Sequence, residues 1–448
     1  MGERRKDALR PGFDRRIKLQ FHGASVSSDA GLFPFRDLDE ACDLTERGAA
    51  ELFDLRTGAN IRRSVVALLR QSVYGRFAGY EDVNDAERLS RDPVMRHVVG
   101  GRAVERAAAS ASEIGRFETE VLTEDGNLAA LMDMPGRWVE AIRQRRPIKR
   151  LIHDMDSSVS ETYGEQEGTA YNGHFECECY HPIFLFNQDA DVERALLRPG
   201  NVASADDWRS VLEPVIERYR HMDVPRFFRA DAAFAIPELY QLLEAEGYRY
   251  AIRLKANRNL EKHISHLLTR PVGRPPKKPQ RFYHSFMYQA ASWSHPRRVV
   301  AKVEWHAGEL FPRVGVIVTN TTGAARRVTH FYNQRGTAEQ WIKEGKNAVK
   351  WTRLSCRRFD ANQARLQLHV LAYDLANFLR RLTLPASVKH WSLTTLREKL
   401  VKIGAKVIHR ARYAIFQLAE VAVPRHLYRT ILRRIARLRE AGPPPPTG

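Results

Sequence analysis

Hydrophobic residues recur at helical spacing over the first third of the chain. The clearest stretches are residues 66–77 and 128–142, and the second is interrupted by Pro135 and Gly136. Apolar positions three and four residues apart lie on one face of a helix, whereas an internal proline removes a backbone donor. We therefore expect residues 1–147 to form a mainly helical N-terminal region, with a helix break at Pro135.

The pattern changes after Lys149 to short runs rich in β-branched and aromatic residues, which favour strands. These runs read KRLIHDMDSSV, HFECECYHPIFLFN, VPRFFRAD and YRYAIRLKA. Two stretches between them, residues 205–219 and 237–246, have helical periodicity. Alternation of strands and helices is typical of an α/β domain, so residues 148–257 are predicted to be the first part of an α/β core.

A basic, proline-rich segment interrupts this core. Residues 269–281 contain four prolines and five Lys or Arg, a composition that sustains neither a helix nor a central strand. The runs RFYHSFMYQAASW and RRVVAKVEW that follow predict an antiparallel insertion, and RVGVIVTN returns as a strand. Residues 258–325 are thus expected to be a β-rich insertion with a basic Pro-rich loop.

The last third of the chain is predicted to be helical. Apolar residues at spacings of three and four between Leu368 and Leu382 indicate a well-buried helix, so residues 326–385 are expected to complete the core. Residues 386–448 are expected to be a basic helical C-terminal region that ends in a disordered tail, AGPPPPTG.

Composition narrows the class of protein. The chain has 448 residues, of which 43% are hydrophobic and 28% are charged, which is enough apolar material for globular cores. No run of apolar residues is long enough to span a bilayer, and the first residues lack the apolar core of a signal peptide. Four cysteines in this length do not make a disulfide framework. We expect a soluble protein of the cytoplasm, associated with the nucleoid and with no membrane partner.

Positive charge is concentrated at the C-terminus. The net charge is +19, and the residues from Trp391 onward hold 12 Lys and Arg against 3 Asp and Glu. Leu427, Ile431, Ile435 and Leu438 predict one apolar helix face, with arginines between them. Such a charge balance favours a polyanionic partner, and nucleic acid is commoner than an acidic membrane surface, although charge alone leaves the partner open. Arg429, Arg433 and Arg437 are the expected DNA contacts, although a solvated helix face would look the same.

Two aspartates stand where predicted strands end. Asp156 closes the first strand of the core and Asp231 closes VPRFFRAD. Carboxylates at the C-terminal ends of strands in an open α/β sheet converge on one crevice. Asp154 lies two residues before Asp156 and would share its strand face, so the first aspartate requires a choice, and we favour Asp156.

A third carboxylate is expected on a helix. Tyr332, Arg335, Glu339 and Lys346 have offsets that place them within roughly 60° of one another on a helix of about 100° per residue. Three carboxylates would suit two Mg²⁺ ions, with Mn²⁺ as a substitute, because hard cations prefer oxygen ligands and a pair of them promotes displacement at phosphorus. Arg335 and Lys346 would bind flanking phosphates.

These residues carry a family resemblance. The run YNQRGTAEQWIKEGK matches the Tyr-x2-Arg-x3-Glu-x6-Lys signature of insertion-sequence DDE transposases at every spacing. Together with DMDSSV, LLRPGN and FFRADAAFAIPELYQLLEAEGYRYAIRLKAN, the chain resembles the branch called the thirteen-eighty family, over roughly residues 14–440. One departure is Asp374, where the resemblance leads us to expect asparagine.

The resemblance implies a fold, an activity and site roles. It implies a ribonuclease-H-like catalytic core interrupted by a β-rich insertion, with helical regions at both ends. Asp156, Asp231 and Glu339 would be the catalytic and metal-binding triad, and Tyr332, Arg335 and Lys346 would hold DNA. The implied activity is metal-dependent phosphodiester cleavage at the terminal inverted repeats of a mobile element and strand transfer into target DNA, by a homodimer on DNA.

Other interpretations stay open. The chain could be a catalytically silent repressor derived from a transposase, or a nuclease without strand transfer. His174, Cys177, Cys179 and His181 could suggest zinc, although their spacing is too tight for a usual finger.

Overall fold

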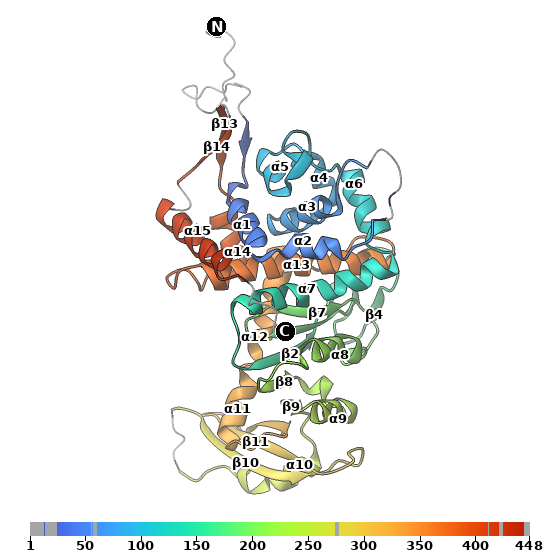
Figure 1. Cartoon of the computed structure of the whole chain (residues 1–448). Coiled ribbons are helices and arrows are strands. Elements are labelled where there is room, and N and C mark those ends of the chain that lie inside the picture. Colours follow the sequence, from blue (N-terminus) through green and yellow to red (C-terminus); the bar gives the residue numbers. More distant parts are fainter. Residues whose placement is uncertain are drawn as a thin grey trace.

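An eight-stranded mixed sheet runs through the middle of the molecule, and helices cover both of its faces (Figure 1). The strand order is β10–β11–β12–β9–β8–β2–β6–β7. The neighbours β2 and β8, and β8 and β9, are parallel, and the other neighbouring pairs are antiparallel. The structure is a computed structural model that describes residues 13, 25–54, 56, 61–273, 277–410, 412–420 and 424–442.

The strands of this sheet are short and largely buried. They are β2 (Leu151–Ser157), β6 (Ile183–Asn187), β7 (Val192–Leu196), β8 (Arg226–Ala230), β9 (Arg249–Leu254), β10 (Gln280–Tyr288), β11 (Arg297–Trp305) and β12 (Arg313–Thr319). Strand β6 is buried at every position, which explains why IFLF shows no polar alternation: both of its faces are covered. A small second sheet beside it holds β3 (Ser160–Glu161), β5 (Cys177–Tyr180) and β4 (Ala170–Asn172).

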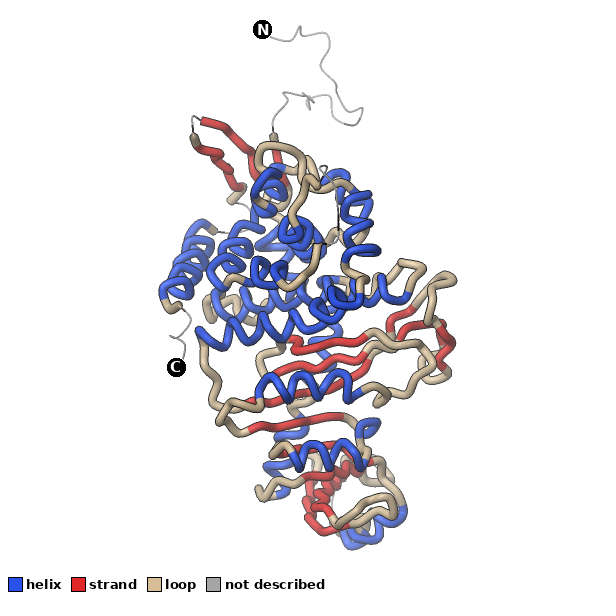
Figure 2. Tube along the Cα trace, turned by 45° about the vertical axis from the view of Figure 1, so that its right-hand side comes forward, coloured by secondary structure: helices blue, strands red, loops and turns tan. Residues whose placement is uncertain are grey.

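Two hydrophobic cores lie on the two faces of the sheet. On one face, Leu185 and Met155 pack with α8 (Trp208–Tyr219) and α9 (Pro237–Ala245). On the other face, Phe184 and Phe186 belong to a larger core shared with the N-terminal and C-terminal helices. Figure 2 shows the strands between these helical layers. Because side chains alternate along a strand, Asp154 and Asp156 point to the opposite face from Met155.

Helices dominate the N-terminal region. They are α1 (Phe33–Cys42), α2 (Leu44–Ala50), α3 (Val65–Phe77), α4 (Ala86–Leu89), α5 (Pro93–Val99), α6 (Ala111–Arg116), a π-helical turn (Phe117–Val121) and α7 (Asp125–Arg145). The expected break in α7 is wrong, because the helix runs through Pro135. Gly136 does not end the helix. It allows close packing, because a Cβ atom at this position would lie 1.9 Å from the Arg218 guanidinium.

The β-rich insertion extends the central sheet instead of forming a separate one. Strand β12 pairs with β9 and carries β11 and β10 outward, so the sheet continues from the core into the insertion. Helix α10 (Arg258–His263) precedes these strands. The middle of the Pro-rich loop, residues 274–276, lies outside the described residues.

One long helix joins the regions. Helix α13 (Phe359–Thr383) is buried on almost every side, including the predicted positions from Leu368 to Leu382, and contacts α3, α7 and α15. Its buried positions include polar side chains, among them Asn362, Gln367 and Asp374, which bond to neighbouring segments. Before it come α11 (Ala325–Asn333), α12 (Gly336–Glu344) and a π-helical turn (Gly345–Val349).

The C-terminal region is only partly helical, which corrects the expectation for residues 386–448. After α14 (Leu393–Leu396) and a π-helical turn (Arg397–Val401), strands β13 (Ala405–Arg410) and β14 (Tyr413–Leu418) form a hairpin that pairs with β1 (Val26–Ser27). Helix α15 (Arg425–Glu440) follows. In the run AKVIHR, apolar and polar residues alternate over too few positions to distinguish a strand from a helical turn.

Two further predictions concern a membrane-spanning helix and the C-terminal tail. No helix within the described ranges is long and apolar enough to cross a membrane. The tail expected to be disordered lies outside the described residues from position 443 onward.

Candidate active site

Asp156 and Asp231 lie at the ends of two adjacent parallel strands. Met155 of β2 is paired with Ala230 of β8, and each aspartate follows its paired residue directly. Neighbouring strands are about 4.8 Å apart, so this register brings the two carboxylates together. Asp231 Oδ1 accepts a hydrogen bond from the Ala233 N–H (3.0 Å), which begins a short 3₁₀ turn and orients the side chain.

Asp154 has a different environment. Arg229 binds both of its carboxylate oxygens, donating from Nε (2.7 Å) and from Nη2 (2.6 Å), and both side chains are buried. Arg229 also donates to the carbonyl of Phe331, which fixes the end of α11 against the sheet. Asp154 is therefore part of a closed ion pair, and Asp156 is the carboxylate at the end of β2.

Arg335 links the sheet to helix α12. Its guanidinium donates from Nη2 to Asp156 Oδ2 (2.8 Å) and from Nη1 to Glu339 Oε1 (3.1 Å). Asp156 is buried, whereas the Glu339 side chain is 57% exposed. Two of the three predicted carboxylates thus meet on one arginine, although they are 183 positions apart in the chain.

The four-residue signature spans two helices and a π-helical turn instead of one regular helix. Tyr332 is near the end of α11, Arg335 immediately precedes α12, Glu339 lies in its first turn, and Lys346 lies in the π-helical turn. Tyr332 is buried against Ala251, and burial, with the charges of Asp231 and Asp156 adding, raises the pKa of its hydroxyl. Lys346 lines a cavity with Glu161 and Tyr163 and not with the three carboxylates.

The three carboxylates lie close enough to influence one another's charge. Burial, with smaller contributions from the negative charges of Asp231 and Glu339, raises the pKa of Asp156 to about 6, although the positive charge of Arg335 lowers it. One guanidinium therefore serves three acidic groups. Such a cluster is suited to an additional cation.

The donor chemistry fits hard divalent cations, but the ligands are not gathered around one point. Among the described residues, no three His, Cys, Asp or Glu side chains are arranged to hold a metal ion together, and this includes the cysteine–histidine set considered for zinc. Glu339 is instead held by the Nη1–H of Arg335 (3.1 Å). A cation shared by all three requires Glu339 to leave that contact. The Nε–H of Arg335 is buried and has no acceptor in the described structure, so an anionic oxygen could bind there.

Lys346, the last residue of the signature, lines a cavity of about 510 Å³ whose lining does not include the three carboxylates or Arg335. Burial lowers the pKa of the Lys346 ammonium group. Tyr163, Glu161 and Arg353 also line the cavity. The sequence analysis did not identify Tyr163 or Arg353. The basic run from Lys350 to Arg358 was the available signal for the arginine, and the tyrosine had none.

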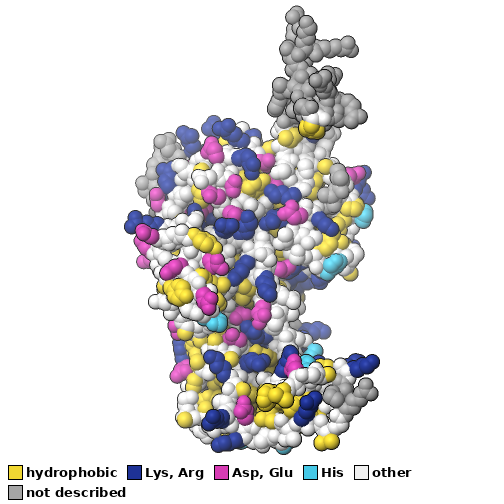
Figure 3. Space-filling model, turned by 180° about the vertical axis from the view of Figure 1, so that it is seen from behind, with side chains coloured by type: hydrophobic (Ala, Val, Ile, Leu, Met, Phe, Trp, Pro, Cys, Tyr) yellow, Lys and Arg dark blue, Asp and Glu magenta, His cyan; other side chains and the backbone are white. Residues whose placement is uncertain are grey.

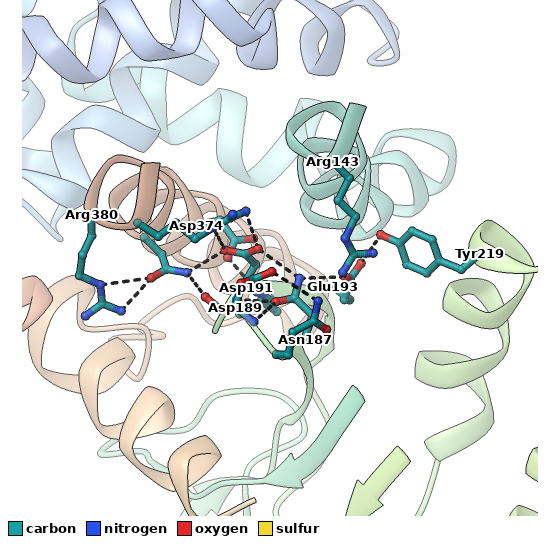
Figure 4. A network of polar contacts seen from close by, with 12 residues as sticks. Arg143, Asn187, Asp189, Asp191, Glu193, Tyr219, Asp374 and Arg380 are labelled. Atoms are coloured by element: carbon teal, nitrogen blue, oxygen red, sulfur yellow. Dashed lines mark hydrogen bonds and ion pairs between the residues drawn. The ribbon is translucent and has the colours of Figure 1, made fainter. Parts of the chain in front are cut away.

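A second group of carboxylates, shown in Figure 4, lies between α7, β7 and α13. Asp191 binds Arg381 (2.8 and 3.0 Å) and Asn377, and Glu193 binds Arg143 (2.8 Å) and Tyr219. Asp374, the departure from the family pattern, accepts a hydrogen bond from the Val192 N–H (2.8 Å). Burial, with Asp191 adding, raises its pKa well above the ordinary value. In its protonated form, Asp374 resembles the expected asparagine in shape and charge.

The basic helix α15 has the predicted apolar face. Leu427, Ile431, Ile435 and Leu438 are buried against α1 and α13. Arg429, Arg433 and Arg437 are exposed. Arg434 instead donates to the carbonyls of Thr383 and Leu384, so it holds the helix to the body.

The chain resembles known proteins both in a family model and among solved structures. The family model described as "Transposase DDE domain group 1" matches residues 9–440. Among solved structures, a cryo-EM structure of the piggyBac transposase synaptic complex with hairpin DNA is similar at 11% identity and a TM-score of 0.43, covering 84% of this chain and 80% of that one. No curated protein matches.

Proposed function

Because the chain belongs to the transposase DDE domain group 1 family, we propose that it is a DNA transposase that cleaves phosphodiester bonds at the ends of its element and joins the freed ends to target DNA. The observation that carries this proposal is the single contact network in which Arg335 binds Asp156 and Glu339 beside Asp231. The motif resemblance to the thirteen-eighty family supports placing the chain in that branch of the insertion-sequence DDE transposases.

The order of the core strands supports a ribonuclease-H-like arrangement. Strands β7, β6 and β2 are antiparallel neighbours, and β8 and β9 continue in parallel from β2. The insertion then separates β9 from the helix that carries Glu339. We assign residues 148–257 and 326–385 to the catalytic core on this basis.

Each residue of the site has a proposed role. Asp156, Asp231 and Glu339 would hold Mg²⁺ or Mn²⁺ through carboxylate oxygens, and the ions when bound supply charge stabilisation to the attacking and leaving oxygens. Arg335 orients Asp156, and its unpaired Nε–H can donate to a phosphate oxygen. Tyr332 supports Arg335 from the buried side, and Lys346 would bind a phosphate at the mouth of its cavity.

The surface offers room for a duplex. Figure 3 shows Lys and Arg side chains from the helical end to the insertion, and the outline is hollowed on the side between them. Helices α11 and α12 run between these two ends in Figure 1. We assign the DNA path to this side, with a homodimer bridging the two element ends.

A cleavage assay tests the proposal. A supercoiled plasmid carrying the element that encodes this chain, with its own flanking DNA, is incubated with the full chain in Mg²⁺ or EDTA. We expect Mg²⁺-dependent cuts at the element ends and joined products. Asp231→Asn and Glu339→Gln should reduce cleavage at least about a thousandfold, since the metal-held charge contributes several kcal/mol. Glu261→Gln, an exposed carboxylate on α10, is the matched control.

The same assay decides the alternative of a silent repressor. Wild-type chain that binds the element ends but never cuts them would support it. Variants that cut at the wild-type rate would show that the carboxylate assignment is wrong, and cuts without joined products would indicate a nuclease.

A salt titration tests the DNA-binding role of α15. Each neutralised phosphate releases counterions, so replacing Arg429, Arg433 and Arg437 by glutamine should reduce the slope of log affinity against log salt by up to about 2.7. The triple variant of Arg146, Lys149 and Arg150, three exposed residues between α7 and β2, removes the same charge elsewhere. Equal slopes for wild type and the α15 variant would exclude this helix from the interface.

A further inference from the structure

The β13–β14 hairpin projects from the helical end of the molecule with one sheet face free. In Figures 1 and 2 it extends beyond the surrounding helices. Its pairs run from Ala405 with Leu418 to Arg410 with Tyr413, and a two-residue turn closes it. Strand β1 pairs with β13 on the other side, so β14 is the edge strand.

The inner face of the hairpin is anchored to the body. Ala405 and Val407 are buried, and the Phe416 ring packs edge-on against Phe33 (4.8 Å between centroids) and His97 (5.1 Å). The Val407 N–H also donates to the Ser25 carbonyl (2.9 Å). The hairpin is therefore held in a fixed orientation although its outer part projects.

The outer face has a different composition. Strand alternation places Lys406, Ile408 and Arg410 of β13 on this face with Tyr413, Ile415 and Gln417 of β14. Tyr413 is 74% exposed, and Lys406, Arg410 and Gln417 are also exposed. The chain has no Asp or Glu between Glu398 and Glu420, so no acidic side chain of this segment offsets the positive charge.

We propose that the outer face of the β13–β14 hairpin enters the major groove of DNA and reads base sequence at the element ends. The major groove, about 12 Å wide, admits a two-stranded ribbon. Outward residues of one strand are about 6.7 Å apart, close to two base-pair steps of about 3.4 Å. This inference rests on the proposed function in one respect: it takes duplex DNA as the partner of the chain.

The side chains on this face are those that read bases. Arginine forms paired hydrogen bonds with guanine, and glutamine does so with adenine. Lys406 and Arg412, which lies in the exposed turn, would contact phosphates on either side. A second copy of the chain pairing along the β14 edge is less favourable, because it would bring two positively charged ribbons together.

The test is selection from a random duplex library by the full chain carrying Asp231→Asn, so that DNA is not cut. We expect the chain to enrich a motif, and methylation at guanine N7, a major-groove atom, to block binding to it. The triple variant Arg410→Ala, Tyr413→Ala, Gln417→Ala should lose its base preference at three to six contiguous base pairs of the motif. Its affinity for the selected duplex should fall about tenfold or more. Its affinity for a scrambled duplex should change only a few-fold.

Two controls keep the result interpretable. The Arg146, Lys149, Arg150 triple variant tests general charge loss, and the thermal unfolding temperature of the hairpin variant should match wild type, since its three side chains are exposed. The single variants Arg410→Gln and Gln417→Ala serve if the triple variant misfolds, and each should relax preference at one base pair.

Other outcomes overturn the inference. Retained preference in the hairpin variants, no enriched motif with wild type, or interference only at minor-groove positions would each exclude major-groove readout by this hairpin. If the hairpin variants change the mass of the protein in sedimentation but not its base preference, the hairpin would be assigned to an interface between copies of the chain. Cleavage of the element plasmid is measured separately, so failure of the proposed activity would not be confused with failure of this readout.

Discussion

Two clusters of carboxylates in this molecule differ in their burial and in their neighbours: Asp191 and Glu193 are fully buried, whereas only Asp156 of the other cluster is buried and Glu339 is exposed. Around Asp191 and Glu193, arginines and amides bind the acidic groups. Arg143, His153 and Arg218 outweigh burial and hold the pKa of Glu193 below its ordinary value, whereas burial still raises the pKa of Asp191 although Arg381 lowers it. Around Asp156, burial and acidic neighbours outweigh Arg335, and the pKa rises to about 6.

We propose that this difference separates a structural cluster of acidic residues from a functional one. The Asp191–Glu193 cluster is neutralised by side chains of α7 and α13, so it joins those helices to β7. In the Asp156–Asp231–Glu339 cluster, one arginine, Arg335, forms ion pairs with both Asp156 and Glu339. A folded protein tolerates acidic groups close together at positions that bind a cation or a substrate.

The largest contrast is expected in stability. Arg381→Met leaves Asp191 buried without its ion-pair partner and should lower the free energy of unfolding by about 3 kcal/mol. Arg335→Met should cost less than about 1 kcal/mol at pH 6, because Asp156 already takes up a proton near that pH. Urea unfolding of the full chain measures both. Equal losses would remove the distinction between the clusters.

The next effect is a pH dependence of cation binding. Below the Asp156 pKa of about 6, protons compete with Mn²⁺, so the apparent affinity should fall about tenfold per pH unit, and it should be level above pH 6. Without a cation, the folded chain holds this proton more tightly than the unfolded chain, so stability falls as pH rises from about 4 to 6. Calorimetric titration with Mn²⁺ checks the first statement. Asp156→Asn should abolish the pH dependence of Mn²⁺ affinity, and Glu261→Gln should preserve it. Any other result would mean that a group other than Asp156 causes this pH dependence.

The smallest effect concerns Asp374. Its pKa is raised in the folded state by burial and by Asp191, so ionisation of the unfolded chain above the ordinary carboxyl pKa destabilises the fold as pH rises. Asp374→Asn keeps an acceptor for the Val192 N–H and removes this penalty. We expect about 1 kcal/mol of added stability at pH 8 and less at pH 5, from thermal unfolding across that range. A constant difference would mean that proton uptake at Asp374 is not the cause.

Local patterns predicted much of the fold and part of the site. The apolar positions of α13 and α15 are buried as their periodicity indicated, because the face of a helix depends only on residues three and four apart. Asp156 and Asp231 were recognisable as strand ends for the same reason: a strand and the polar residue that closes it are adjacent in sequence. The spacing from Tyr332 to Lys346 identified the helical part of the site.

Pairings between distant segments were decided only by the tertiary structure. The amino-acid sequence by itself determined which side chains share a helix face and which strands end in a carboxylate, since these are short-range properties. Arg229 binding Asp154, Arg335 binding Asp156, and β12 extending the core sheet depend on which of several similar segments meet in space. Likewise, the six-residue strands of the β13–β14 hairpin are stabilised by packing on Phe33 and pairing with β1, contacts with residues nearly 400 positions away that no local pattern contains.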